Sequence, residues 1–477
     1  MQLSRYLGDK VFWRTALTLG VPIALQNLLT SSLSLIDTIM VGQLGDISLS
    51  AVGMAGQFSW LMQLVMFGLS SGSAVFISQY WGARDVKGIN RIHGIMLSHM
   101  FSVSLVFFAL GQIIPEIIIK IFNTNPDVVK TGSGYLRIAA FSYPAVALTM
   151  TLSTVLRSTE NVRLPLITSI ITTAENAVLN YVLIFGKLGF SAMGIAGAAL
   201  ATAISAWTGV FILIVASALR RNTACAGLKE LLGFKKELLF KFYKISAPAI
   251  ANESIWGLGT FCYNIIFGRL GYDVYAAMTI FRTVDGIAFT LLVGLCNACC
   301  IMIGKYIGIG QIKEALRDSK RFAVLIPIVS FVIGIGLIIF RGPIVSVFSM
   351  GDSITEFTRN TAMLFIAIYG AEYGIRNIPY IQIVGIFRPG GDTAIGLRYD
   401  GICLWGISMP LTVVAAFVLK WPAPAVFATM LLAEDIVKGI MCIRRYKSRK
   451  WLKPITQEGR EALAEFLAES ATATYAS

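Results

Sequence analysis

The sequence is poor in charged residues and in histidine. Only 14% of its 477 residues are charged and two are histidine, whereas 56% are apolar. Soluble domains are roughly a quarter charged, so the composition excludes a soluble domain of any size. The chain also lacks an HExxH motif, a CxxC pair with a nearby histidine and a glycine-rich phosphate loop. We therefore expect no enzyme and no cofactor.

Long apolar runs recur along the whole chain. Runs such as residues 323–340 and 402–419 approach the ~20 residues that cross a bilayer. The first 14 residues are basic and contain no cleavage site, so we expect them to be a retained cytoplasmic leader. Twelve spans are predicted, near residues 16–40, 50–76, 95–121, 131–157, 163–186, 193–218, 240–268, 275–303, 320–342, 357–387, 398–420 and 422–446.

The formal net charge of +14 could suggest nucleic acid, but the positions of the basic residues argue against it. With the N-terminus inside, most lysines and arginines lie in inner segments, for example in residues 220–241 and 444–450. This pattern predicts a multi-pass protein of the inner or plasma membrane with both termini in the cytoplasm. Its surroundings are the lipid bilayer, and we expect a monomer.

The two halves of the chain match each other without a gap at an offset of 226 residues. Pro22 aligns with Pro248, Gly45 with Gly271, and further pairs follow up to residues 80–82 and 306–308. Later in each half, Arg157 matches Arg388 at an offset of 231. Because each half contains an even number of spans, the copies enter the membrane in the same direction.

The predicted fold class is therefore an all-α polytopic membrane protein. Its twelve transmembrane helices form two six-helix bundles related by a pseudo-twofold axis along the membrane normal. The predicted domains are an N-terminal bundle, a cytoplasmic linker, a C-terminal bundle and a cytoplasmic tail with an interfacial helix, at residues 1–218, 219–240, 241–446 and 447–477.

Several motifs along the chain resemble those of the multidrug and toxic compound extrusion (MATE) transporter family. They are carried, in order, by residues 37–45, 51–55, 77–85, 180–186, 194–202 and 385–393, and the likeness covers about residues 10–450. The resemblance implies two six-helix bundles facing each other across a cleft. It also implies a secondary active antiporter that exports organic cations or drugs by alternating access, coupled to inward flow of Na⁺ or H⁺.

Three other functions were weighed against export. A flippase for a lipid-linked or other amphipathic substrate would need a large cationic cavity, and arginine and lysine are scarce in the middle of the spans. The sequence lacks the motifs that a membrane enzyme would need. A duplicated bundle with acidic interior residues argues against a channel.

Asp37 is the leading candidate for ion coupling. It shares one face of its predicted helix with Gln26, Thr30 and Ser34, so this face must contact protein or water. Ionisable side chains at mid-membrane depth are costly and therefore candidates for function. Asp37 could bind a proton or Na⁺, and the alternative is a structural hydrogen bond.

Asn176 and Asn180 lie one helical turn apart and offer oxygen ligands for Na⁺. The resemblance implies that they lie beside Asp37, with Thr202 nearby. A metal site of Asp37, Asn176 and Asn180 is thus predicted if the protein is sodium-coupled, while helix-to-helix hydrogen bonding is the alternative.

Glu253 is the second candidate for coupling, and it also belongs to the predicted substrate-binding set. It shares a helical face with Asn264, and its repeat partner is Asn27. The resemblance implies that it binds the coupling ion or the positive charge of the substrate, and the alternative is a buried structural hydrogen bond. The other predicted substrate-binding residues are Tyr263, Asn264, Tyr373 and Asn377.

Two further groups of charged residues are predicted to form ion pairs. Glu372 and Arg376 are one turn apart, which favours a structural pair. Glu434 and Asp435 are expected to pair with Lys438 or with the basic end of the last span. Because Asp37 has Tyr263 as its repeat partner, we expect coupling mainly in the N-terminal bundle.

Overall fold

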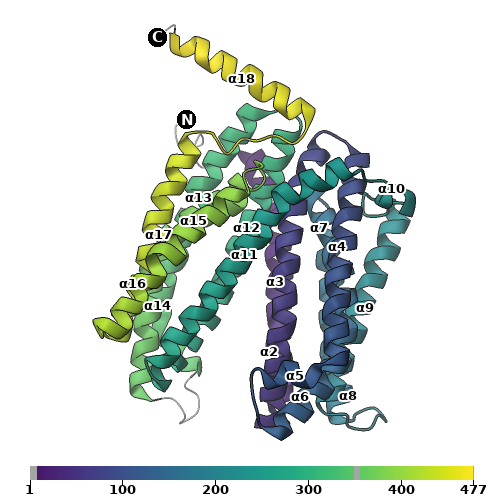
Figure 1. The fold of residues 1–477 in the computed structure, drawn as a ribbon, viewed down its shortest axis with the longest axis vertical. Helices are drawn as coiled ribbons and strands as arrows, with labels where there is room; N and C mark the ends of the chain where they lie inside the picture. Colours follow the sequence, from purple (N-terminus) through teal and green to yellow (C-terminus); the bar gives the residue numbers. More distant parts are fainter. Residues whose placement is uncertain (1–7, 349–354, 476–477) are drawn as a thin grey trace. The chain divides into compact units, whose positions relative to one another are not determined.

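A computed structural model describes residues 8–348 and 355–475, which form helices and turns and contain no strand (Figure 1). The helices of the first half are α2 (Lys10–Gly42), α3 (Asp46–Gly82), α4 (Val86–Ile113), α5 (Pro115–Lys120), α6 (Pro126–Ala139), η1 (Ala140–Ser142), α7 (Tyr143–Ser158), α8 (Arg163–Phe185), α9 (Ile195–Arg220) and α10 (Leu228–Leu232). The second half contains α11 (Lys236–Arg269), α12 (Tyr272–Gly308), α13 (Ile312–Phe348), α14 (Glu356–Tyr380), η2 (Ile381–Phe387), α15 (Ala394–Asp400), η3 (Gly401–Ser408), α16 (Met409–Val413), η4 (Val414–Val418), α17 (Ala423–Lys447) and α18 (Gln457–Tyr475).

Nine helical segments in the described ranges are long and apolar enough to cross a membrane. Three more predicted spans fall on α11, α14 with η2, and α17, which have the length but less apolar sequences. Each of these three contains ionisable residues in its interior, which lower the mean hydropathy. Polar residues inside a membrane must face protein or water, so these helices are the candidates for a site in the second half.

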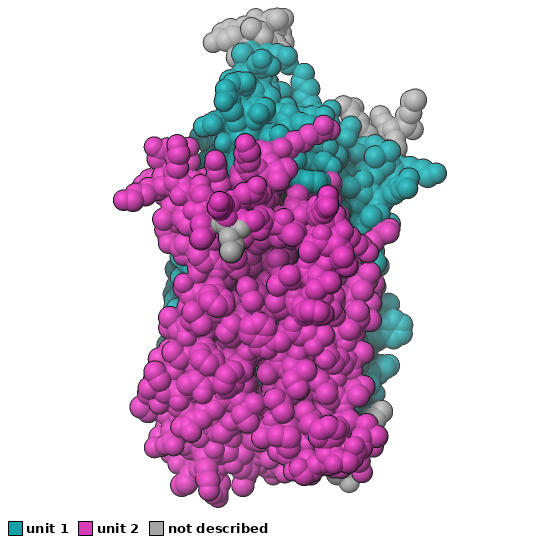
Figure 2. Space-filling view, turned by 90° about the vertical axis from the view of Figure 1, so that its right-hand side faces the viewer, with its two compact units in different colours: residues 1–24, 78–83, 245–477 teal, residues 25–77, 84–244 magenta. Residues whose placement is uncertain are grey.

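The chain divides into two compact units, coloured separately in Figure 2. Unit 1 contains residues 1–24, 78–83 and 245–477, and unit 2 contains residues 25–77 and 84–244. Unit 1 thus includes the N-terminal part of α2, up to residue 24, and the C-terminal end of α3, from residue 78. The predicted bundle boundaries at residues 218 and 241 stay a prediction.

The duplication found in the sequence is visible in local backbone geometry. Pro22 lies inside α2 and its repeat partner Pro248 lies inside α11. Gly45 and Gly271 occupy equivalent turns after these helices, with φ of +100° and +133°. Residues with a side chain rarely adopt such angles, so both copies need glycine there.

Close contacts through glycine hold the helices that carry the candidate sites. In unit 2, Gly197 of α9 packs against the backbone of Leu183 on α8. In unit 1, Gly334 of α13 and Gly370 of α14 face each other so closely that a side chain on either would meet the other's carbonyl group. Small residues allow membrane helices to approach in this way.

The C-terminal segment is anchored to unit 1. Trp451 is fully buried against Gly390, and the backbone N–H of Ile455 donates to Gln79 Oε1 at 2.7 Å. Gln79 Nε2 also donates to the carbonyl of Pro389 at 2.7 Å. The predicted C-terminal helix is confirmed as α18, and its position at the membrane interface stays a prediction.

The N-terminal end of the described chain is held to α13. Asp9 forms an ion pair with Arg321 at 3.1 Å, and the Arg321 guanidinium lies 5.3 Å from the Phe12 ring centroid. Half of the predicted leader, residues 1–7, lies outside the described residues.

Candidate functional site

In unit 2, the structure brings together Asp37, Asn180 and Asn176. Asn180 Nδ2 on α8 donates a short hydrogen bond to Asp37 Oδ1 on α2. The same nitrogen lies 2.9 Å from Asn176 Oδ1, and both asparagines are fully buried while Asp37 is half-buried. Since Asn176 and Asn180 are one turn apart on α8, they present both amides to the same side.

Ser205 joins this group and was missed in the sequence. Asn176 Nδ2 donates to Ser205 Oγ at 3.1 Å, and Ser205 belongs to α9. The predicted residue Thr202, three positions earlier, donates to the carbonyl of Ala198 in its own helix at 3.0 Å. The spacing of Thr202 and Ser205 places them near each other on the helix surface, which was the signal available.

Two features of this site bear on cation binding. No lysine or arginine in the described parts of the chain forms an ion pair with Asp37. In addition, Asn180 Oδ1 is buried without a hydrogen-bond partner. A half-buried carboxylate beside an unpartnered amide oxygen fits a proton or a hard cation such as Na⁺. The described residues contain no cluster of three or more His, Cys, Asp or Glu suited to a metal ion.

The repeat-related arginines make equivalent contacts in the two halves. In unit 2, Arg157 Nη2 donates to Gln26 Oε1 at 2.6 Å. In unit 1, Arg388 Nη2 donates to Asn252 Oδ1 at 2.9 Å, and Asn252 is the repeat partner of Gln26. The duplication therefore preserved an arginine-to-amide contact, which aligned amides in the sequence could have revealed.

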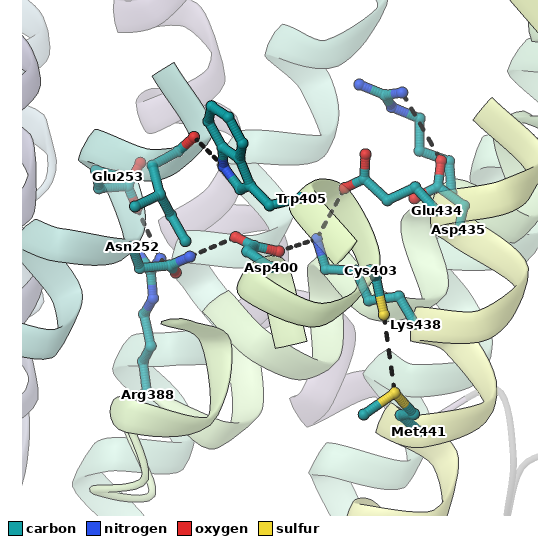
Figure 3. Close-up of polar contacts among 12 residues, drawn as sticks. Asn252, Glu253, Arg388, Asp400, Cys403, Trp405, Glu434, Asp435, Lys438 and Met441 are labelled. Atoms are coloured by element: carbon teal, nitrogen blue, oxygen red, sulfur yellow. Dashed lines mark hydrogen bonds and ion pairs between the residues drawn. The ribbon is translucent and has the colours of Figure 1, made fainter. Parts of the chain in front are cut away.

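Glu253 distinguishes the unit 1 copy from the unit 2 copy. Its Oε1 lies 2.7 Å from Arg388 Nη2, and the two side chains are 14% and 4% exposed (Figure 3). The repeat partner of Glu253 is Asn27, which has no charge. Glu253 is thus a neutralised member of a buried ion pair rather than an isolated carboxylate.

The contacts continue from Asn252 across the interior of unit 1, as Figure 3 shows. Asn252 Nδ2 donates a short hydrogen bond to Asp400, which in turn forms a close ion pair with Lys438. Lys438 Nζ also lies 3.2 Å from Glu434 Oε1, so the predicted pairing of Glu434 with Lys438 is confirmed. Asp400 was missed because it lies at the end of a predicted span, where charge is ordinary.

The predicted ion pair between Glu372 and Arg376 is wrong, because Arg376 pairs with a different carboxylate. Arg376 Nη1 on α14 lies 3.8 Å from Asp435 Oδ2 on α17. Asp435 therefore pairs with Arg376 and not, as predicted, with Lys438 or the basic end of the last span. Both oxygens of Glu372 are buried without a hydrogen-bond partner. Helical spacing permits a contact between Glu372 and Arg376, but the neighbouring helix provides a competing carboxylate.

The remaining predicted substrate-binding residues lie in the same unit as Glu253. Tyr263 and Ser408 form a hydroxyl–hydroxyl hydrogen bond of 2.7 Å. Tyr373 and Asn377 are buried, and Asn377 Nδ2 donates to the carbonyl of Tyr373 at 2.8 Å, whereas Asn264 is half-buried. Substrate contact by these residues stays a prediction.

A family model described as MatE matches residues 22–182 and 248–414 of this chain. The chain is 26% identical over 449 residues to the uncharacterized transporter YisQ of Bacillus subtilis, which covers 94% of this chain and 96% of YisQ. It is 23% identical over 436 residues to the probable multidrug resistance protein NorM of Thermotoga maritima, covering 91% and 92% of the two chains.

Solved structures share the fold at low sequence identity. The MATE transporter VcmN of Vibrio cholerae in its bent form has a TM-score of 0.78 at 19% identity, covering 95% of this chain and 98% of that one. A MOP superfamily transporter from Pyrococcus furiosus, with a binding pocket of reverse polarity that suggests a different function, has a TM-score of 0.80 at 16% identity, covering 94% and 98%. The predicted all-α fold of twelve transmembrane helices in two six-helix bundles is confirmed.

Proposed function

Since this chain belongs to the MATE family of multi-pass membrane transporters, we propose that it is a secondary active antiporter that exports organic cations or drugs. Export is coupled to inward flow of H⁺ or Na⁺ by alternating access. The names of its relatives, several of them probable multidrug resistance proteins, support a drug-like cargo. It acts as a monomer in the inner or plasma membrane, with both termini in the cytoplasm.

The observation that carries the proposal is the Asp37 site. Its carboxylate is half-buried, receives one hydrogen bond from Asn180, and has no basic partner among the residues described. An uncompensated charge in a poorly solvated position gains stability by binding a proton or a cation. Asp37 can therefore alternate between a loaded and an empty state as access changes from one side of the membrane to the other.

The surrounding side chains have distinct roles in this proposal. Asn180 holds the Asp37 carboxylate, and its own Oδ1 atom provides an additional oxygen ligand if Na⁺ is the coupling ion. Asn176 and Ser205 fix the orientation of Asn180. Thr202 completes the coupling site from α9.

Glu253 and its neighbours form the second part of the proposal. Glu253 attracts the positive charge of the substrate or coupling ion, which must compete with Arg388 for the carboxylate. Tyr263, Asn264, Tyr373 and Asn377 are proposed to contact the substrate when it reaches unit 1. A buried ion pair is strongly destabilised when one partner leaves, so substrate must replace Arg388 as the partner rather than simply expose Glu253.

The alternative is a flippase for a lipid-linked or other amphipathic substrate, which would need basic residues free to bind an anionic headgroup. In unit 1 the partly or fully buried bases Arg376, Arg388 and Lys438 are each paired with a carboxylate. This pairing favours export of cations.

The decisive experiment uses proteoliposomes with a fluorescent organic cation under separately imposed H⁺ and Na⁺ gradients. We expect one gradient to drive transport and the Asp37→Asn variant to lose this transport. The control is Asp46→Asn, which replaces an exposed carboxylate at the start of α3 and should retain the wild-type rate. Gradient-driven transport at full rate by Asp37→Asn would contradict the coupling role. Movement of a lipid-linked substrate without cation transport would favour the flippase.

A further inference from the structure

The strongest unexplained feature of unit 1 is the surroundings of Glu372. This side chain is only 3% exposed, and neither of its carboxyl oxygens has a hydrogen-bond partner. Arg376, one turn further along α14, pairs instead with Asp435 at 3.8 Å. Asp435 is itself 5% exposed, so two buried carboxyl groups are placed around one guanidinium.

The charged side chains on the helices around Glu372 and Lys438 include more acidic than basic groups. These side chains provide five carboxyl groups and three basic groups, an excess of two carboxyls: Glu253, Glu372, Asp400, Glu434 and Asp435 against Arg376, Arg388 and Lys438. Three of the carboxyls, Glu253, Asp400 and Glu434, pair with Arg388 or Lys438, and Asn252 links Arg388 to Asp400. Asp435 pairs with Arg376, and Glu372 forms no ion pair with a base among the described residues.

The helices packed around α14 add no further base to this pair. The helices α13 and η2 pack against α14, and residues 322–340 of α13 and 381–387 of η2 contain no ionisable residue. On α12, Arg282 donates to the carbonyl of Thr260, and Asp285 accepts a short hydrogen bond from Tyr369. On α17, Glu434 is acidic and Lys438 is bound to Asp400 and Glu434. One negative charge at Glu372 and Asp435 is therefore unmatched.

An unmatched buried carboxylate costs several kcal/mol, and protonation removes that cost. A metal ion fits this position poorly, because Arg376 already forms an ion pair with the Asp435 carboxylate. The Arg376 guanidinium also lies 5.5 Å from the Tyr369 ring centroid. The described residues also include no acidic cluster suited to a metal ion. A proton needs only the two carboxyl groups.

We propose that Glu372 and Asp435 share one exchangeable proton and form a second proton-binding site, separate from Asp37. In the loaded state the Glu372 carboxyl donates a hydrogen bond to the Asp435 carboxylate, which keeps its ion pair with Arg376. Loss of the proton leaves two carboxylates competing for Arg376. This inference rests on the proposed function, since a proton held there contributes to transport only in a coupled transporter.

Infrared spectroscopy tests the site without requiring transport. Purified protein in lipid is titrated with acid while the carbonyl stretching band of buried carboxylic acids is recorded. We expect Glu372→Gln to remove one such band, because the glutamine amide replaces the protonated carboxyl and can still donate to Asp435. Asp435→Asn should shift or remove the same band. Glu356→Gln, an exposed glutamate on the same helix, is the matched control and should leave it unchanged.

The coupling role is tested in proteoliposomes through the number of protons that enter per exported cation, measured from the reversal potential. We expect Glu372→Gln to lower this ratio by one while the variant still transports. A band and a ratio unchanged in both Glu372→Gln and Asp435→Asn would overturn the inference and leave the proposed function standing. A band that weakens when Na⁺ replaces choline at constant pH would also overturn it, since Na⁺ would then occupy the site.

Misfolding and failure of transport remain distinguishable from these outcomes. If Glu372→Gln does not fold, a wild-type band that is insensitive to Asp435→Asn overturns the inference, and one that responds supports it. If wild-type protein shows the band but moves no cation under either gradient, the proton site stands and the proposed function fails.

Discussion

Arg157 and Arg388 provide a stability experiment in which one half of the molecule serves as the control for the other. Each arginine donates to an amide oxygen at an equivalent position of the repeat, Gln26 at 2.6 Å and Asn252 at 2.9 Å. Of the two, Arg388 alone forms an ion pair with a carboxylate among the described residues, that of Glu253 at 2.7 Å. Replacing each arginine with methionine therefore removes the same amide contact and differs in one ion pair.

The magnitudes follow from these contacts. Arg157→Met removes a charged hydrogen bond to a neutral acceptor, which stabilises a protein by about 1.5–3 kcal/mol. Arg388→Met leaves the Glu253 carboxylate buried without a partner, and breaking such a pair costs about 3–5 kcal/mol. We therefore expect Arg388→Met to lose the larger part of the free energy of unfolding. Adding Glu253→Gln to Arg388→Met should restore part of the loss, because no uncompensated charge remains.

The assay is denaturation with sodium dodecyl sulfate in mixed micelles, followed by tryptophan fluorescence, on the two single variants, Glu253→Gln and the double variant. The double-mutant cycle isolates the interaction between Glu253 and Arg388. Equal losses for Arg157→Met and Arg388→Met, with no restoration in the double variant, would refute the conclusion that the repeat acquired a stabilising ion pair in one copy only.

Two further outcomes concern the ends of the chain. Trp451→Ala should destabilise unit 1 by about 3–5 kcal/mol, because Trp451 is fully buried against Gly390, and it should speed proteolysis before α18, whereas Trp421→Ala, at a 47% exposed site, should not. The hydrogen bond from the Phe12 N–H and the ion pair with Arg321 lower the pKa of Asp9. The ionised Asp9 carboxylate therefore stabilises the folded state above the unfolded pKa of about 3.9, and this stabilisation is lost as the pH falls through the lower folded pKa. Hydrogen exchange at residues 9–12 should be faster in Asp9→Asn than in wild type at neutral pH and equal in strong acid, and a difference that persists in strong acid would contradict this reasoning.

Much of the fold was predictable because its signals are local. Apolar runs of membrane length marked the predicted spans, including those on α11, α14 and α17, where ionisable residues lower the hydropathy. The aligned pairs of Pro22 with Pro248 and Gly45 with Gly271 marked equivalent bends and turns. The neighbours of Asp37 on α8 were predicted through a family resemblance, and the structure brings both asparagines to it.

Partners on different helices were less accessible to sequence reasoning. Ser205 was overlooked in favour of Thr202, since both lie on one face of α9 and only packing against α8 decides which contacts Asn176. Asn252 and Asp400 were not predicted as site residues, although together they connect Arg388 to Lys438.

By itself, the sequence determined the helices, their duplication and the presence of carboxylates inside them, because hydropathy and helical periodicity depend on neighbouring residues. Only the tertiary structure decided which charges neutralise each other. Arg376 had a carboxylate one turn away in Glu372, and it pairs with Asp435 because the packing of α14 against α17 brings that group to its guanidinium. That choice leaves Glu372 buried without a partner, since electrostatic pairing depends on distance in space.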